Sequence, residues 1–381
     1  VINVHEHAGF YIRNFISNSD TLLQSIPADR RQVGETTVSF EEKNGPYEKI
    51  LGVYWNTKSD VFGYNLNKLH VRNDLLRSQR NPTKREAVSL VMSVYDPAGL
   101  ISHITIQGRI QLRGIHIAVK DWDQQIPSDL ADAWRSWLKQ LNNIGDFVVP
   151  RCIRPAAALF TEIHTFVDAS KDAFAACVYA RSYDGNIFTN HLLAAKARVA
   201  PIKQLSIPRL ELQAALLGTR QAKTAIAELR IEINRSVFWS DSQTVLGWIK
   251  NRKRKYQQFV THRVSEILET TTMDQWCWVP SKENPADAAT KITNNENLWK
   301  YGPEFLLKPE FDWPTSKREY ETQEEMVLTM SESGELISVE NYSSWTRLVR
   351  HTIFLRKFVQ YIINKRSFDP TIKMSDAEAA R

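Results

Sequence analysis

The spacing of apolar residues predicts helices in the first part of the chain. Residues 83–86, Thr-Lys-Arg-Glu, form a capping-box pattern, and the apolar residues that follow share one helical face until Asp96 and Pro97 end it. A second helix is expected from Ser128, where apolar residues recur at intervals of three and four. Before these helices, residues 47–66 contain β-branched and aromatic residues around a polar turn and predict a hairpin. Residues 1–150 are therefore expected to be α+β and mostly helical.

After residues 150–155 the periodicity changes and predicts a sheet. Three successive segments with strand character are separated by short turns, which indicates an antiparallel meander. A strong helix is expected near Pro208, followed by a strand and by further alternation of helix and strand. The expected strands and later elements are residues 163–167, 173–181, 187–199, 236–239, 245–249, 264–268 and 276–279. This order predicts an α/β domain with a mixed sheet that ends near residue 293.

The composition fits a folded protein of two or three domains. The chain has 381 residues, of which 43% are hydrophobic and 24% are charged, and this excludes wholesale disorder. The sequence has neither a stretch of about 18 apolar residues nor a signal peptide, so we expect a soluble intracellular protein without a membrane partner. Its three cysteines lack the spacing of a zinc site. The net charge of +6 permits a polyanionic partner without requiring one.

Four acidic residues in the expected α/β domain occupy positions that surface acids seldom occupy. Asp168 and Asp241 each follow a buried strand, Glu211 lies in the first turn of the helix after Pro208, and Asp287 lies at an expected helix start. Taken alone, each has a simple structural explanation, since such acids often cap or stabilise a helix. Together they can converge at one edge of the sheet. Clustered carboxylates repel one another, so such a site needs cations, and oxygen ligands suit Mg²⁺.

The motifs around these acids resemble the ribonuclease H domain of retrotransposon polyproteins. They read TFVDAS, IPRLELQAA, FWSDSQTVLGWI and NPADAATK. Residues 195–201, AKARVAP, are similar to an A-K-x-R-V-A-P segment of the Pao/BEL retrotransposons. Residues 83–100 and 121–123 resemble the stretch between polymerase and ribonuclease H in the same elements. Residues 10–60 resemble the tail of the reverse transcriptase palm, and residues 345–366 the stretch ahead of the integrase.

The resemblance implies a metal-dependent nuclease. Asp168, Glu211, Asp241 and Asp287 would be the catalytic acids and would bind two Mg²⁺ or Mn²⁺ ions. The implied reaction is cleavage of the RNA strand of an RNA–DNA hybrid by an activated water, which needs no serine or cysteine nucleophile. The implied partners are this hybrid and the upstream reverse transcriptase and downstream integrase parts of the same polyprotein. The implied location is the cytoplasm, in a virus-like particle, and the nucleus.

The same resemblance divides the chain into six parts. An α/β, ribonuclease H-like domain with a mixed sheet is expected after an α+β, mostly helical thumb and connection region. The expected parts are the palm tail at 1–70, the helical thumb and connection at 71–150, the ribonuclease H-like domain at 151–293, a linker that is acidic toward its end at 294–340, a basic amphipathic helix ahead of a missing integrase at 341–366, and a tail at 367–381.

Departures from the family pattern leave an alternative open. Many ribonucleases H place a histidine shortly before the last aspartate, where this chain has SKEN at residues 281–284, so that water or Glu283 would transfer the proton. Residues 289–291, ATK, stand where related elements tend to read Ser-Arg-Gly. The alternative is an inactive ribonuclease H-fold remnant or connection module that binds nucleic acid or its polymerase partner.

Two other activities are not expected. The sequence lacks the Tyr-x-Asp-Asp loop of a polymerase, so the chain has no polymerase active site. An aspartic peptidase needs Asp-Thr/Ser-Gly, and the nearest strings, at residues 168–170 and 241–243, lack this motif. Peptidase activity is therefore not expected.

A basic stretch follows the expected helix after Asp241. No acid occurs between Trp248 and Arg263, and the aromatic residues Trp248, Tyr256 and Phe259 could stack on sugars or bases of a nucleic acid. The alternative is a solvated loop between two helices. The candidate nucleic-acid-binding residues are Lys196, Arg198, Arg209, Lys250, Arg252, Lys253, Arg254 and Lys255.

Overall fold

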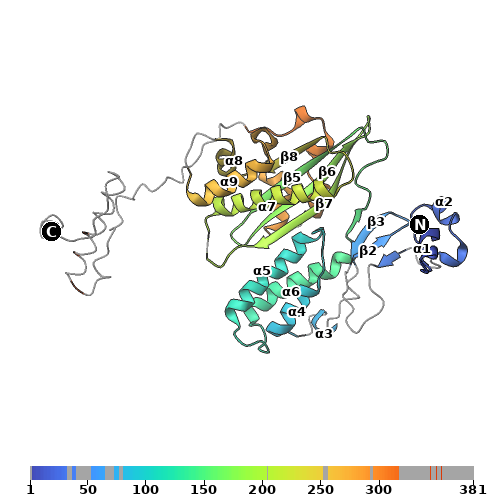
Figure 1. The fold of residues 1–381 in the computed structure, drawn as a ribbon. Helices are drawn as coiled ribbons and strands as arrows, with labels where there is room; N and C mark the ends of the chain where they lie inside the picture. Colours follow the sequence, from blue (N-terminus) through green and yellow to red (C-terminus); the bar gives the residue numbers. More distant parts are fainter. Residues whose placement is uncertain are drawn as a thin grey trace. The chain divides into compact units, whose positions relative to one another are not determined.

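A five-stranded mixed sheet with the strand order β7-β6-β5-β8-β9 is the centre of the fold (Figure 1). The first three strands in sequence pair antiparallel, and β8 and β9 run parallel to β5. The strands are β5 Phe160–Ala169, β6 Ala173–Tyr183, β7 Phe188–Val199, β8 Arg235–Ser240 and β9 Trp276–Trp278. The predicted α/β class, the mixed sheet and the antiparallel meander are confirmed.

The structure is a computed structural model. It describes residues 2–31, 37–39, 53–64, 73–76, 80–203, 205–251, 256–291 and 295–316, together with residues 344, 349 and 353. The chain divides into two compact units, Val1–Glu324 and Glu325–Arg381. The expected basic helix at 341–366 falls almost wholly outside the described residues. In the described part of the chain, no helix has the length and apolar character needed to cross a membrane.

Three helices cover one face of the sheet (Figure 1). They are α7 Ile207–Glu228, α8 Gln243–Lys250 and α9 Gln258–Thr270. Adjacent strand residues point to opposite faces, so Val167 packs with Leu217 of α7 while Phe166 packs in a second cluster with Trp299. Residues 245–249 lie in α8, and residues 264–268 lie in the next helix, α9. The strict alternation of helix and strand expected there was wrong, because Val260, Val264 and Ile267 have helical spacing and bury one face of α9.

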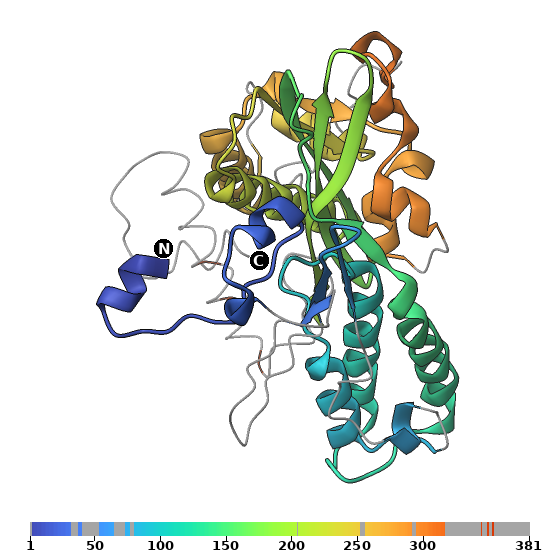
Figure 2. The same cartoon turned by 90° about the vertical axis from the view of Figure 1, so that its right-hand side faces the viewer.

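The segment after residue 294 covers part of the second face of the sheet (Figure 2). The segment after residue 294 contributes α10 Glu296–Tyr301 and the short 3-10 helices η7 Glu304–Leu307 and η8 Glu310–Asp312. Trp299 and Leu306 are fully buried in this segment. The linker assigned to 294–340 therefore begins with a packed segment over its described residues 295–316, because its aromatic and aliphatic side chains complete the core. The acidic part of that linker lies outside the described residues.

The first part of the chain supplies a small sheet and a set of helices, as predicted. The antiparallel sheet has the order β1-β2-β3-β4, and β2 and β3 form the expected hairpin. The helix predicted after residue 82 begins with a complete capping box between Thr83 and Glu86. The elements are α1 Ile2–His7, α2 Asp20–Gln24, β1 Thr37–Ser39, β2 Val53–Asn56, β3 Val61–Tyr64, α3 Asn73–Leu76, α4 Lys84–Ser93, α5 Ser102–Ala118, α6 Ser128–Asn142 and β4 Val148–Pro150. Helix α5 was not predicted.

The helices of the first part and the five-stranded sheet share one hydrophobic core. The Trp299 indole Nε1 donates a hydrogen bond of 2.7 Å to the carbonyl oxygen of Leu100, and the Ala195 backbone N–H of β7 donates one of 2.9 Å to the carbonyl of Ala98. These bonds join the loop between α4 and α5 to the edge of the sheet. Packing thus crosses the boundary that was expected at residue 150.

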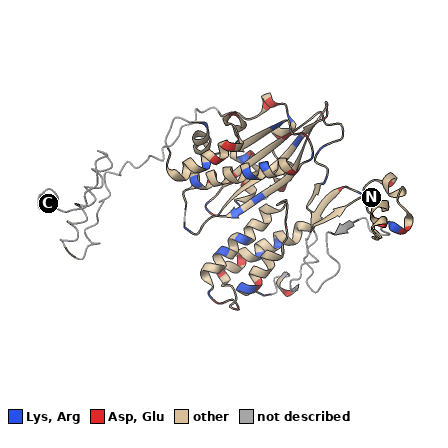
Figure 3. Ribbon diagram, viewed as in Figure 1, with Lys and Arg blue, Asp and Glu red and all other residues tan. Residues whose placement is uncertain are grey.

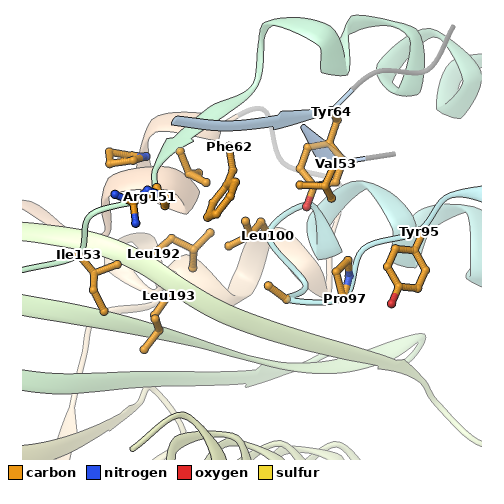
Figure 4. Close-up of a pocket in the computed structure, with 13 residues that line it drawn as sticks. Val53, Phe62, Tyr64, Tyr95, Pro97, Leu100, Arg151, Ile153, Leu192 and Leu193 are labelled. Carbon is orange, nitrogen blue, oxygen red and sulfur yellow. The ribbon is translucent and has the colours of Figure 1, made fainter. Parts of the chain in front are cut away.

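An apolar cavity of about 280 Å³ lies between the β2–β3 hairpin, the loop before α5 and β7 (Figure 4). Phe62, Leu100 and Leu192 are among the side chains that line it, one from each of these parts. Arg151 lies at the same cavity and forms a 2.6 Å ion pair with Asp60. The Arg151–Asp60 ion pair therefore joins the turn of the hairpin to the residue after β4, and the apolar side chains between the hairpin and β7 leave a cavity unfilled.

Candidate active site

Asp168 and Asp241 lie side by side at one edge of the five-stranded sheet. Asp168 is the penultimate residue of β5, and Asp241 directly follows β8. The two strands are parallel, with Val167 opposite Ser240, so the next residue of each strand is an aspartate. The side chain of Asp168 is buried, because the residue is only 4% exposed. The predicted placement of these two acids at neighbouring strand ends is therefore present in the structure.

Glu211 approaches the same edge from helix α7. Pro208 lies in the first turn of this helix, where its missing N–H is not needed. The Ser242 hydroxyl donates a 2.6 Å hydrogen bond to Glu211 Oε2, and its oxygen accepts a hydrogen bond from the Val245 backbone N–H. Ser242, the residue after Asp241, thus caps α8 and at the same time holds the Glu211 carboxylate by a hydrogen bond.

Asp287 lies in the 3-10 helix η6, Pro285–Ala289, which is attached to the end of β5. The buried Asn284 side chain donates a 3.0 Å hydrogen bond to the carbonyl oxygen of Val167. The Ser170 hydroxyl donates one of 2.8 Å to the carbonyl oxygen of Thr290. The Thr290 hydroxyl in turn donates to Asp168 Oδ2. Segment 284–290 is therefore held beside Asp168 by hydrogen bonds on both sides of Asp287.

Each of the four acids has a different donor. Thr290 donates to Asp168 and Ser242 donates to Glu211. The Ser281 hydroxyl of the 3-10 helix η5, Ser281–Glu283, donates a 2.5 Å hydrogen bond to Asp241 Oδ2. The Lys291 ammonium donates to Asp287 Oδ1. These hydroxyl and ammonium donors fix the orientation of the carboxylates.

The charges of neighbouring acids act on one another's pKa. Burial, together with the charge of Asp241, raises the pKa of Asp168 to about 7, against the opposing effect of the hydrogen bond from Thr290. Burial also raises the pKa of Glu211, the Ser242 hydrogen bond opposes this, and the charge of Asp241 adds to the rise. Perturbation of pKa by burial and like charge is common in active sites.

The donor set suits a hard divalent cation, because it consists of carboxylate oxygens that repel one another. In the residues that the structure describes, however, no three side chains of histidine, cysteine, aspartate or glutamate are close enough to hold one ion. Each carboxylate is turned toward its own hydroxyl or ammonium donor instead. Metal binding would therefore need a rearrangement of side chains around the same four acids.

The candidate nucleic-acid-binding residues are divided between exposed and packed positions. Lys196 and Arg198 are exposed two residues apart on β7, which is an edge strand of the sheet. Figure 3 shows the lysine and arginine positions of the described residues in blue. Arg209 donates a 2.6 Å hydrogen bond to Gln257 and lies 5.2 Å from the ring centre of Phe259. Lys250 is half-buried at the end of α8. The other predicted residues, 252–255, lie outside the described residues.

The prediction that Trp248 stacks on nucleic acid was wrong. Its side chain is 1% exposed and packs in the core under α8, because the apolar face of this short helix points at the sheet. Phe259 is half-buried, with the guanidinium of Arg263 3.5 Å and that of Arg209 5.2 Å from its ring centre. An aromatic ring with two arginines near it is thus present close to the start of α7, and this ring comes from α9.

The sequence reasoning missed the residues that hold the acids. No sequence motif marks either serine as a donor to an acid. Ser242 follows Asp241, and Ser281 lies in the segment where many ribonucleases H have a histidine. Thr290 and Lys291 were noticed only as a departure from the family pattern. Glu283, which was expected to transfer a proton, is exposed on η5. A search for hydroxyl residues one to four positions from each acid would have found Ser242 and Thr290.

Comparison with known proteins supports a ribonuclease H-like domain in this part of the chain. Residues 83–242 match the family model described as the Pao retrotransposon-like RNaseH-like domain. The match begins at the capping box of α4 and includes Asp168, Glu211 and Asp241. No curated protein matches the chain.

Solved ribonuclease H structures show limited similarity. The N-terminal RNase H domain of a Mycobacterium tuberculosis protein, solved as a fusion with maltose-binding protein, is 12% identical over 36% of this chain and 91% of that chain, with a TM-score of 0.26. LC11-RNase H1 in complex with an RNA/DNA hybrid is 12% identical over 36% and 99%, with a TM-score of 0.26.

A longer enzyme is also similar. The foamy viral protease-reverse transcriptase in complex with an RNA/DNA hybrid is 14% identical over 65% of this chain, with a TM-score of 0.36, and this chain spans 30% of its length. The family match and the mixed sheet identify within this chain a ribonuclease H-like α/β region that is similar to that of Pao retrotransposons.

Proposed function

We propose that the chain is a metal-dependent endonuclease that cleaves the RNA strand of RNA–DNA hybrids within a retrotransposon Pol polyprotein of the Pao/BEL type. The observation that carries the proposal is the convergence of Asp168, Glu211, Asp241 and Asp287 at one sheet edge. Their charges interact although they come from two strands, a long helix and a 3-10 helix. Phosphodiester hydrolysis is a reaction for which grouped carboxylates without a nucleophilic side chain are suited.

The four acids would hold Mg²⁺ or Mn²⁺, as two ions. When bound, the ions would supply an activated water and stabilise the leaving oxygen of the phosphodiester. The chain's own contribution is orientation. Ser242 holds Glu211, and Asn284 holds the backbone before Asp287 against β5. The buried position of Asp168 excludes bulk water from one side of the site.

Basic residues beside the acids would contact the hybrid. Lys196 and Arg198 project from the exposed side of β7, and Arg209 lies two residues before Glu211. Hybrids are recognised through phosphates and 2′-hydroxyls, so such contacts are tolerant of sequence and sensitive to salt. The upstream reverse transcriptase and the downstream integrase of the same polyprotein are the proposed protein partners.

One observation favours a second candidate function, an inactive module that binds nucleic acid or its polymerase partner. The position where many ribonucleases H have a histidine is part of η5, where Ser281 bonds Asp241 and Glu283 is exposed. Under this alternative the site would keep its fold and its affinity for hybrid without turnover.

Replacement of Glu211 separates the two candidates. Glu211→Gln should lower the rate of hybrid cleavage with Mg²⁺ strongly and leave hybrid affinity similar or tighter, because one negative charge facing a phosphate is removed. Glu228→Gln is a matched control, since Glu228 is exposed at the other end of the same helix. Equal cleavage rates for Glu211→Gln and the control would show that Glu211 is not a catalytic residue. Hybrid binding without cleavage by the parent protein would favour the inactive module.

A further inference from the structure

Lys291 connects the charges of the candidate site. Its ammonium donates a hydrogen bond to Asp287 Oδ1, and its side chain is 50% exposed against 24% for Asp287. Its positive charge also lowers the pKa of Asp168 and of Glu211, where burial and Asp241 act in the opposite direction. The charge of Asp241 in turn acts on Lys291. The ammonium of Lys291 therefore contacts Asp287, and its positive charge also acts on the other three carboxylates.

The backbone of Lys291 is held by a hydrogen bond, and its side chain is half-exposed. The Lys291 backbone N–H donates a 2.9 Å hydrogen bond to the carbonyl oxygen of Asp287, one helical turn earlier. The preceding residue, Thr290, is buried and is held by Ser170 and Asp168. The long lysine side chain therefore begins at a constant position beside the acids, and only its torsions decide whether the ammonium contacts Asp287.

A divalent ion and this ammonium would compete for the same oxygens. A carboxylate that is paired with an ammonium has to lose or share that partner before it can bind a metal ion, and like charges disfavour both cations in one site. In the described structure the carboxylates are arranged around hydroxyls and this ammonium, and no three of them form a common ligand set. The Lys291 ammonium thus lies among carboxylates whose mutual repulsion a cation would reduce.

We propose that Lys291 is a positioning residue that acts as a tethered cation: its ammonium neutralises the carboxylate site in the absence of metal and leaves Asp287 when a divalent ion binds. The inference rests on the proposed function, because it requires that the four acids bind a metal. It predicts that Lys291 weakens metal binding while it stabilises the metal-free fold.

Metal affinity is the direct readout. We would measure Mn²⁺ binding to the full chain by the electron paramagnetic resonance signal of free Mn²⁺, for the parent, Lys291→Met and Lys282→Met. Lys291→Met should bind Mn²⁺ about three- to tenfold more tightly, because one nearby positive charge is removed from a partly solvent-screened site. Lys282→Met removes the same charge from an exposed position on η5 and should change the affinity less than about twofold.

Thermal unfolding gives a second readout that is independent of nuclease activity. In EDTA, Lys291→Met should unfold at a lower temperature than the parent, because the acids then lack a neutralising cation. Saturating Mn²⁺ should remove the difference, and Lys291→Arg should behave like the parent in EDTA. A Lys291→Met protein that is equally stable in EDTA would overturn the neutralising role.

The outcomes separate this inference from the proposed function. If the parent and Lys291→Met bind Mn²⁺ equally and Asp241→Asn abolishes binding, the metal site stands and the role of Lys291 is overturned. If neither the parent nor Lys291→Met binds Mn²⁺, both the metal site and the role of Lys291 are overturned. Tighter binding by Lys291→Met that is lost on adding Asp241→Asn supports both.

Discussion

The Thr290 hydroxyl donates a hydrogen bond to the buried carboxylate of Asp168, a residue 122 positions earlier in the chain. The same hydroxyl lies 3.2 Å from the carbonyl oxygen of Asp287, and the Thr290 carbonyl accepts from Ser170. Thr290 therefore links the end of β5 to the segment that carries Asp287.

Replacement of Thr290 should loosen the site and the fold. Thr290→Val keeps the shape of the side chain and leaves the buried Asp168 without its hydroxyl donor, so the free energy of unfolding should fall by about 1–2 kcal/mol. Thr290→Ser keeps the hydroxyl and is the matched control. Urea denaturation of both variants measures the difference. Equal stability of the valine and serine variants would show that the hydrogen bond contributes nothing.

Asp168 should make the stability of the metal-free protein depend on pH. Burial, with the charge of Asp241, raises its pKa from 3.8 to about 7, so the stability that it contributes is full below pH 3.8 and is lost as the pH rises through 7. Asp168→Asn should therefore stabilise the protein at pH 8 in EDTA by about 1–3 kcal/mol, and have little effect at pH 4. Thermal unfolding at the two pH values tests this. A destabilised variant at pH 8 would contradict it.

A buried charge cluster at the other end of β5 should stabilise the fold near neutral pH. Glu162 accepts hydrogen bonds of 2.6 Å from Arg181 and 3.0 Å from Arg235. His164, which accepts from the Trp239 indole at Nδ1, contacts Glu162 through Nε2 at 3.3 Å. Full burial of His164 lowers its pKa, and the hydrogen bond with Glu162 opposes this shift.

Glu162→Gln should cost about 3 kcal/mol at pH 7, because it leaves the buried Arg181 without its carboxylate. Burial raises the pKa of Glu162, but the hydrogen bond from His164 and the two arginines outweigh this and hold it at about 2. Its contribution is present above pH 4.5 and is lost between pH 4.5 and 2. Denaturation at pH 7 and pH 3 should therefore show a deficit that shrinks in acid. A deficit that is constant with pH would exclude the charge as its cause.

The exposed basic residues of β7 should contribute to binding by charge alone. Replacing both Lys196 and Arg198 with alanine should weaken binding to an RNA–DNA hybrid of any sequence, and the slope of log K against log salt should become shallower by about 1–2. Fluorescence anisotropy at several salt concentrations gives this slope. An unchanged slope would show that Lys196 and Arg198 do not contact the phosphates of the hybrid. The double replacement Lys223→Ala and Arg230→Ala removes the same charges elsewhere and is the control.

The sequence predicted the sheet and the four acids because both have local signals. Val167 and Asp168 mark the end of a buried strand, and helix α7 has a proline in its first turn with apolar spacing behind it. Helix α5 was missed because its many isoleucines have weak helix propensity and its helical face is set by packing against the sheet. The donors to the acids were missed for a related reason. Contacts such as Thr290 with Asp168 depend on how distant segments meet, which no local pattern contains.

Cleavage of a labelled RNA–DNA hybrid with and without Asp241→Asn tests the central claim most directly. With Mg²⁺ or Mn²⁺ the parent protein should cut only the RNA strand, and EDTA should stop the reaction. Asp241→Asn should abolish cutting, whereas Asp274→Asn, an exposed aspartate on the 3-10 helix η4, Met273–Gln275, should cut like the parent. Cleavage that persists in EDTA, or in Asp241→Asn at the parent rate, would contradict the account.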